Sequence, residues 1–99
     1  MKHFLLFYDA APDYLARRPD FRTAHLAYAW AAVERGELVL GGALADPTDP
    51  AVWLFKAQDG AVVRAFAEAD PYVTNGLITG WQVREWTTAV GTDATVRVA

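Results

Sequence analysis

One histidine and one aspartate are the residues of this chain best suited to acid–base chemistry. His25 lies within a helical sequence pattern, and Asp70 precedes a proline after a second such pattern. Imidazole exchanges protons near neutral pH, and a carboxylate on one ring nitrogen fixes its tautomer while the other nitrogen carries the proton. These residue types predict a catalytic pair of His25 and Asp70.

Both residues also have a purely structural interpretation. A histidine at the edge of a helix can be satisfied by a backbone carbonyl, and Asp before Pro is typical of a helix N-cap followed by its preferred first residue. Capping a helix and orienting a histidine are compatible roles for one carboxylate. The two predicted helices are neighbours in the expected topology, so we expect Asp70 to lie within reach of His25.

Three further residues are candidates for binding a substrate at the same site. Arg22 lies one helical turn before His25 and has the charge to hold an anionic substrate. Tyr72 offers a hydroxyl, and Gly42, in the pair Gly41-Gly42, leaves room for a ligand. The structural alternatives are a solvated arginine, a packing aromatic ring and a β-bulge.

The composition excludes several kinds of chemistry. The 99 residues contain no cysteine, which removes disulfides, thiolate catalysis and thiolate metal sites. Only His3 and His25 offer imidazole nitrogens, on different elements, and the acidic residues show no spacing typical of a metal site. No glycine-rich segment matches the dinucleotide-binding pattern. We therefore expect neither a metal nor an organic cofactor.

Charge and hydropathy also narrow the possible partners. The net charge is −3, and no basic stretch is longer than Arg17-Arg18, which argues against binding to nucleic acid. The apolar run at residues 4–8 is too short for a signal peptide, and no window approaches the roughly 20 apolar residues of a membrane-spanning helix. We expect a cytoplasmic protein that binds a small molecule.

Four segments bounded by turn residues predict β-strands. They cover residues 4–8, 38–44, 51–56 and 77–86. Helical patterns occupy residues 21–35 and 61–69. The order βαββαβ predicts a ferredoxin-like α+β fold, an antiparallel four-stranded sheet with both helices on one face. The domain is expected to span residues 1–90, followed by a C-terminal tail at 91–99 in which residues 95–98 pair at a sheet edge.

Proline and apolar spacing predict the details of the helices. Pro19 is expected to end a preceding turn, and Asp20 to cap the first helix. A stripe at i, i+4 and i+7 predicts the buried face of this helix and places His25 at its edge. The stripe consists of Leu26, Trp30 and Val33. The inward residues expected in the second helix are Val62, Ala65, Phe66 and Ala69.

The strands carry more apolar surface than two helices can cover. Hydrophobic residues make up 54% of the chain, and the first three strands are apolar at nearly every position. The sheet face away from the helices therefore needs another cover, and a second copy of the chain is the simplest one. We expect a homodimer in which two sheets pack face to face as a closed barrel with clefts beside the helices.

Four segments carry a resemblance to a known family. They are FLLFY at residues 4–8, RTAHL at 22–26, GGAL at 41–44 and ADPYV at 69–73. In this order they resemble the YciI-like (YCII-related) family of small bacterial proteins. The resemblance implies a dimeric α+β barrel, a proposed active-site dyad that falls on His25 and Asp70, and kinship with muconolactone isomerase-like proteins and a dehydrochlorinase.

The residues and the resemblance together give one leading hypothesis. It is a cofactor-independent enzyme in which His25, oriented by Asp70, moves a proton on a small cyclic or aromatic substrate during isomerisation, elimination or lactone chemistry. The alternative is a non-catalytic, small-ligand-binding or stress-related dimer that uses the same cleft.

Overall fold

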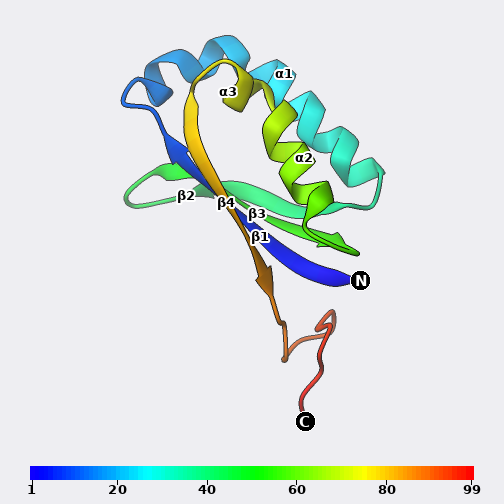
Figure 1. The fold of residues 1–99 in the computed structure, drawn as a ribbon. Coiled ribbons are helices and arrows are strands. Elements are labelled where there is room, and N and C mark those ends of the chain that lie inside the picture. Colours follow the sequence, from blue (N-terminus) through cyan, green and yellow to red (C-terminus); the bar gives the residue numbers. More distant parts are fainter.

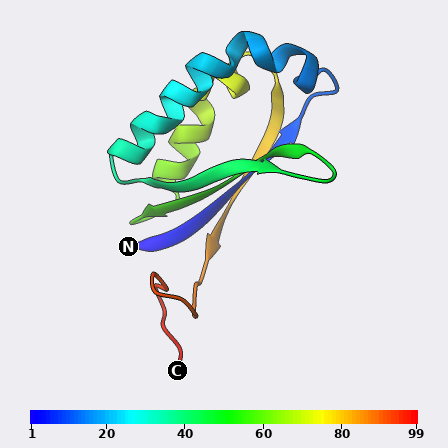
Figure 2. The same ribbon diagram turned by 180° about the vertical axis from the view of Figure 1, so that it is seen from behind.

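Four antiparallel strands form one sheet in the order β2-β3-β1-β4 in the computed structural model, which describes residues 1–99 (Figure 1). The strands are β1 (Lys2–Ala10), β2 (Leu38–Leu44), β3 (Asp49–Ala57) and β4 (Ile78–Trp86). The helices are α1 (Tyr14–Glu34), α2 (Ala61–Ala69) and the short α3 (Pro71–Thr74). Figures 1 and 2 show all three helices on one side of the sheet, which confirms the predicted ferredoxin-like fold.

Alternation along β1 divides the two faces of the sheet. Phe4, Leu6 and Tyr8 are buried in the core that the helices cover. Leu5 and Phe7 point to the opposite face because successive side chains alternate in a strand, and Phe7 is 37% exposed. The helices therefore leave an apolar face of the sheet uncovered, and the expected homodimer stays a prediction.

Helix α1 begins earlier than expected. It starts at Tyr14 and continues through Pro19, so the predicted break at Pro19 and the predicted cap at Asp20 are wrong. Proline has no backbone N–H. The carbonyl of Leu15, which would accept a hydrogen bond from residue 19 in a regular helix, therefore lacks this donor. Leu15 is 56% exposed, so this carbonyl lies on a residue that faces solvent.

Tertiary contacts hold the first turn of α1 against α3. The ring of Tyr14 packs edge-to-face on Tyr72, with 5.9 Å between the centroids. Arg17 Nη2 donates a hydrogen bond to the backbone oxygen of Asn75 at 2.8 Å. These contacts stabilise a turn that the local rule for proline disfavours.

The buried stripe of α1 is also rotated from the predicted one. His25, Ala29 and Ala32 are buried, whereas Leu26 is 40% exposed and Trp30 is 65% exposed. This offset of one residue corresponds to a rotation of about 100°. Two alanines let α1 approach the layer beneath it closely. As a result, His25 lies inside the interface instead of at its edge.

Helix α2 has the predicted bounds, but its buried face differs in part. Val63, Phe66 and Ala67 are buried, and only Phe66 belongs to the predicted set. Ala65 and Ala69 are exposed. The core therefore contacts a stripe centred on Phe66.

The end of the chain folds back on itself after β4. The backbone nitrogens of Val96 and Val98 donate to the backbone oxygens of Thr88 and Ala89, at 3.0 and 2.9 Å. Thr88 Oγ1 also lies 2.7 Å from Nδ1 of the buried His3. Residues 95–98 therefore pair with the segment after β4, and the predicted pairing at a sheet edge is wrong.

No helix of the molecule combines the length and the apolar character needed to cross a bilayer.

Candidate active site

Asp70 lies at the junction between α2 and α3, where its carboxylate caps the second of these helices. Its backbone is extended, with φ −62° and ψ 129°, and Pro71 takes the first helical position. The backbone nitrogen of Tyr72 donates to Asp70 Oδ1 at 3.0 Å. This is the N-cap that the Asp-Pro sequence predicts.

The same carboxylate oxygen contacts the histidine of α1. Asp70 Oδ1 lies 2.7 Å from His25 Nδ1; Asp70 is fully buried, and His25 is 5% exposed. An ionised carboxylate only accepts hydrogen bonds, so Nδ1 carries a proton and Nε2 of the neutral ring has the free lone pair. Nε2 has no hydrogen-bond partner in the chain, and His25 lines a pocket. The expectation that Asp70 both caps a helix and contacts His25 is confirmed.

A tyrosine of β1 occupies the other oxygen of this carboxylate. Tyr8 Oη donates to Asp70 Oδ2 at 2.5 Å. Burial, followed by the negative charge of Asp70, raises the pKa of Tyr8 far above its ordinary value of 10.0, so the hydroxyl stays a neutral donor. From the sequence, Tyr8 was predicted only to be part of an apolar strand. The need of a buried phenol for a polar partner was the signal for this contact.

Aromatic rings fix the plane of the imidazole. The ring of Tyr72 stacks on His25 with 3.6 Å between the centroids and an interplanar angle of 3°. Trp53 of β3 contacts His25 from the edge, at 5.4 Å and 68°. With Nδ1 held by Asp70 as well, the direction in which Nε2 points is determined.

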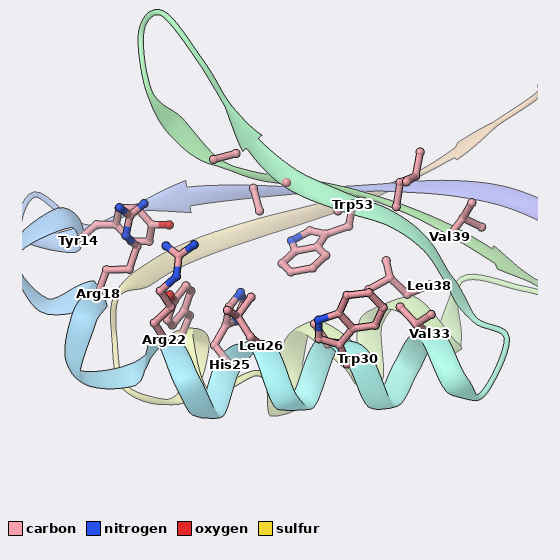
Figure 3. Close-up of a pocket in the computed structure, with 17 residues that line it drawn as sticks. Tyr14, Arg18, Arg22, His25, Leu26, Trp30, Val33, Leu38, Val39 and Trp53 are labelled. Carbon is pink, nitrogen blue, oxygen red and sulfur yellow. The ribbon is translucent and has the colours of Figure 1, made fainter.

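A pocket of about 400 Å³ lies between α1 and β2, and His25 forms part of its wall (Figure 3). Tyr14, Arg18 and Arg22 stand at one end of the pocket, whereas apolar side chains stand at the other (Figure 3). The apolar residues at that end include Trp30, Val33, Leu38 and Val39. The pocket therefore has a cationic end and an apolar end.

The two arginines at the cationic end have no acidic partner. Arg17 forms an ion pair with Asp13 at 3.9 Å, but neither Arg18 nor Arg22 forms one. Burial raises the pKa of Tyr72, and the positive charges of Arg22 and Arg18 oppose this rise. Arg22 was predicted from the sequence; Arg18 was missed because the predicted break at Pro19 left it outside the helix that carries Arg22.

The two glycines of β2 have different surroundings. A Cβ atom on Gly41 would lie 2.2 Å from Trp53 Cε3, so the missing side chain makes room for the indole. A Cβ atom on Gly42 would meet nothing within 4 Å, and Gly42 lines the pocket. Both Gly42 and Tyr72 thus lie where a ligand would contact them.

This arrangement can move a proton. A histidine that lines a pocket and is held by a buried carboxylate is suited to general acid–base chemistry, because the carboxylate stabilises the imidazolium that forms when the ring accepts a proton. No three His, Cys, Asp or Glu side chains lie close enough to hold a metal ion.

Comparisons with known proteins agree with the observed fold. No curated protein matches the chain significantly. A solved structure that is similar is 5-chloro-2-hydroxyhydroquinone dehydrochlorinase (TftG) from Burkholderia phenoliruptrix AC1100, in complex with 2,5-dihydroxybenzoquinone. It has 26% sequence identity and a TM-score of 0.73, and the match covers 88% of this chain and 95% of that one. The family model of the YCII-related domain matches residues 1–87, and the chain therefore belongs to the YCII-related family.

Proposed function

We propose that this protein is a cofactor-independent enzyme in which His25 transfers a proton on a small cyclic or aromatic substrate. The observation that carries the proposal is the 2.7 Å hydrogen bond from His25 Nδ1 to the fully buried Asp70. His25 also lines the pocket, and its Nε2 has no hydrogen-bond partner in the chain. This proton transfer needs no metal and no organic cofactor, because the unperturbed pKa of histidine, about 6.5, already lies near neutral pH.

The proposed step begins with His25 Nε2 as a general base. It accepts a proton from the substrate, and Asp70 stabilises the resulting imidazolium. In an elimination, the electron pair of the broken bond to hydrogen forms a double bond while a leaving group departs with its own pair. In an isomerisation, the imidazolium returns the proton to another atom of the substrate. Tyr8 Oη and the Tyr72 backbone N–H hold the carboxylate in place during both steps.

The similar dehydrochlorinase supports elimination as the first reaction to test. Its name describes the loss of hydrogen chloride from a chlorinated hydroxyhydroquinone, a reaction that requires a base for the proton. The two sequences are 26% identical over nearly the whole of the dehydrochlorinase chain, which supports testing the same type of reaction in the present chain. We infer that the natural substrate of the present chain is a small ring compound of this kind.

The experiment measures chloride release from 5-chloro-2-hydroxyhydroquinone by the wild type and by His25→Asn. Asparagine retains an N–H that can donate to Asp70, but it has no basic nitrogen. We expect kcat of the variant to fall by about 100-fold or more. Glu34→Gln, an exposed change at the end of α1, is the control and should leave kcat unchanged.

Two outcomes would contradict the enzyme proposal. One is equal turnover by the wild type and His25→Asn. The other is tight binding of 2,5-dihydroxybenzoquinone without turnover of any ring compound in a panel of halogenated phenols, lactones and quinols. The second result would favour the ligand-binding alternative, which uses the same pocket.

A further inference from the structure

The indole nitrogen of Trp53 is a buried hydrogen-bond donor without a partner. Trp53 is 4% exposed, and its Nε1 is the one buried side-chain nitrogen or oxygen atom that lacks a hydrogen bond. Folded proteins leave few such groups unpaired, because an unsatisfied buried donor costs about 1–3 kcal/mol. The same residue lines the pocket beside His25. A ligand that contacts this wall of the pocket would supply the missing acceptor.

The surrounding residues hold the indole in a fixed orientation. Gly41 has no side chain where the six-membered ring of Trp53 passes. The rings of Tyr8, His25 and Phe66 contact the indole at angles of 64–68°, with centroids 5.3–5.8 Å away. Figure 3 shows the nitrogen on the side of the indole that faces Arg22 and His25. The unpaired donor is therefore part of a rigid wall.

A second observation is the charge at the end of the pocket that the indole nitrogen faces (Figure 3). Arg18 and Arg22 are one helical turn apart, line the pocket and have no acidic partner. Guanidinium groups bind carboxylates and other oxyanions by charge-assisted hydrogen bonds. Two free cations and an unpaired N–H favour a ligand with several oxygen acceptors and a negative charge.

We propose that the pocket binds a planar ring oxyanion whose oxygen accepts a hydrogen bond from Trp53 Nε1 while its charge faces Arg18 and Arg22. The apolar end of the pocket, which includes Trp30 and Val39, contacts the body of the ring. This inference rests on the proposed function in that it describes the substrate of the same site. Trp53 becomes a substrate-binding residue, and Arg18 and Arg22 select charge.

The test observes the indole N–H group directly. The chain has four tryptophans, so protein labelled with ¹⁵N gives four indole signals. Replacement by Phe at Trp30, Trp81 and Trp86 assigns three of them and leaves Trp53 by elimination. The probe is 2,5-dihydroxybenzoquinone, which is an anion at neutral pH because its hydroxyls are acidic. We expect the Trp53 signal to move downfield on saturation, while that of the distant Trp86 stays in place.

A binding measurement adds a second readout. Trp53→Phe keeps most of the aromatic volume and loses the N–H, so we expect its Kd for the probe to rise by about tenfold or more. Trp86→Phe is the matched control and should keep the Kd of the wild type. An unshifted Trp53 signal at saturation, or an unchanged Kd in folded Trp53→Phe, would overturn the role of Trp53.

The charge requirement is tested with 2,5-dimethoxybenzoquinone, which has the same ring and oxygens but no ionisable hydroxyl. We expect it to bind the wild type at least tenfold more weakly than the dihydroxy compound, and the double change Arg18→Gln/Arg22→Gln to remove this difference. Equal binding of the two quinones by the wild type would show that the pocket does not select an anion.

These measurements do not depend on turnover, so the two proposals can fail separately. If the wild type turns over no ring compound but the anion shifts the Trp53 signal, the ligand class stands and the enzymatic function is wrong. If His25 is essential for turnover but the anion leaves Trp53 unaffected, the ligand contact is wrong and the enzymatic function stands.

Discussion

The rings of His25 and Tyr72 lie parallel, 3.6 Å apart, although they belong to different helices. Tyr72 follows Asp70 by two residues, so one short helix supplies both the ring that stacks on the imidazole and the carboxylate that bonds to it. The hydrogen bond fixes one point of the imidazole, and the stacking fixes its plane. Together they leave Nε2 a single direction, as a proton transfer requires.

Removal of the stacked ring tests whether this orientation matters. Tyr72→Leu keeps an apolar side chain of moderate size but no flat surface, so the imidazole gains freedom to tilt. We expect kcat to fall by about tenfold to 100-fold, because misplacement of a reacting group by about 1 Å has effects of this size. Tyr72→Phe retains the stack and should retain kcat. A fall in kcat of the same size in both variants would contradict an orienting role for the ring.

Asp70→Asn separates the cap from the charge. Asparagine caps a helix about as well as aspartate, and its oxygen can still accept from Tyr72 N and His25 Nδ1. Its amide NH₂ group, however, cannot accept the hydrogen bond that Tyr8 Oη donates to Oδ2. We expect a folded protein that loses about 1–3 kcal/mol of unfolding free energy. Since the imidazolium has lost its negative partner, kcat should fall by about 10²-fold or more.

The measurements are urea unfolding at pH 7 and turnover of the same substrate by both proteins. Turnover of Asp70→Asn equal to that of the wild type would show that Asp70 acts only as a helix cap.

Local signals in the sequence were sufficient for most of the fold. Strand β4 was predicted from residues 77–86, and its side chains alternate, with Trp81 and Val83 on one face and Gln82 on the other. The Asp70-Pro71 cap was predictable because both residues act on their own backbone.

The parts that could not be predicted depend on distant partners. His25 was placed at the edge of the helix interface because the apolar stripe was drawn through its large neighbours, whereas in the structure its burial is set by Asp70, 45 residues away in the chain. Continuation of the helix through Pro19 depends on contacts between its first turn and α3. The roles of Tyr8 and Trp53 in the site likewise follow from pairings across the sheet and with the helices, which no local pattern in the sequence shows.

Tyr8 should make the protein sensitive to alkali. Its pKa is raised in the folded state, so the unfolded chain releases the phenolic proton above pH 10 while the folded chain keeps it. The stabilisation is complete below the unfolded pKa and is lost as pH rises past it, by at most about 1.4 kcal/mol per pH unit for one group. In Tyr8→Phe this loss is absent.

We therefore expect the wild type to be more stable than Tyr8→Phe at pH 8, where its hydrogen bond to Asp70 is intact, and the difference to shrink between pH 10 and pH 11. Urea unfolding at these pH values measures the difference in unfolding free energy between the two proteins. A difference that stays constant over the range would contradict the raised pKa. Tyr28 and Tyr72, whose pKa values are also raised, are present in both proteins and cancel in the comparison.

The two neighbouring glycines of β2 offer a matched pair of substitutions. Gly41→Ala places a Cβ atom 2.2 Å from the indole of Trp53, whereas Gly42→Ala places one in open space. The first change must displace a ring buried in the core, so we expect it to cost about 1–3 kcal/mol of unfolding free energy and to weaken ligand binding. Gly42→Ala should be near neutral in stability. Equal unfolding midpoints for the two variants would show that the contact between Gly41 and Trp53 does not constrain the fold.

The uncovered face of the sheet predicts self-association. Leu5 pairs with Leu54 and Phe7 with Val52 across β1 and β3, so these side chains form one apolar patch on the face without helices. We expect a dimer by light scattering coupled to gel filtration at micromolar concentration. Leu54→Lys should give a monomer, because a charge in the centre of the interface would be buried without a partner. Ala27→Lys adds the same charge on the exposed side of α1 and should remain a dimer; a monomeric wild type would contradict the prediction.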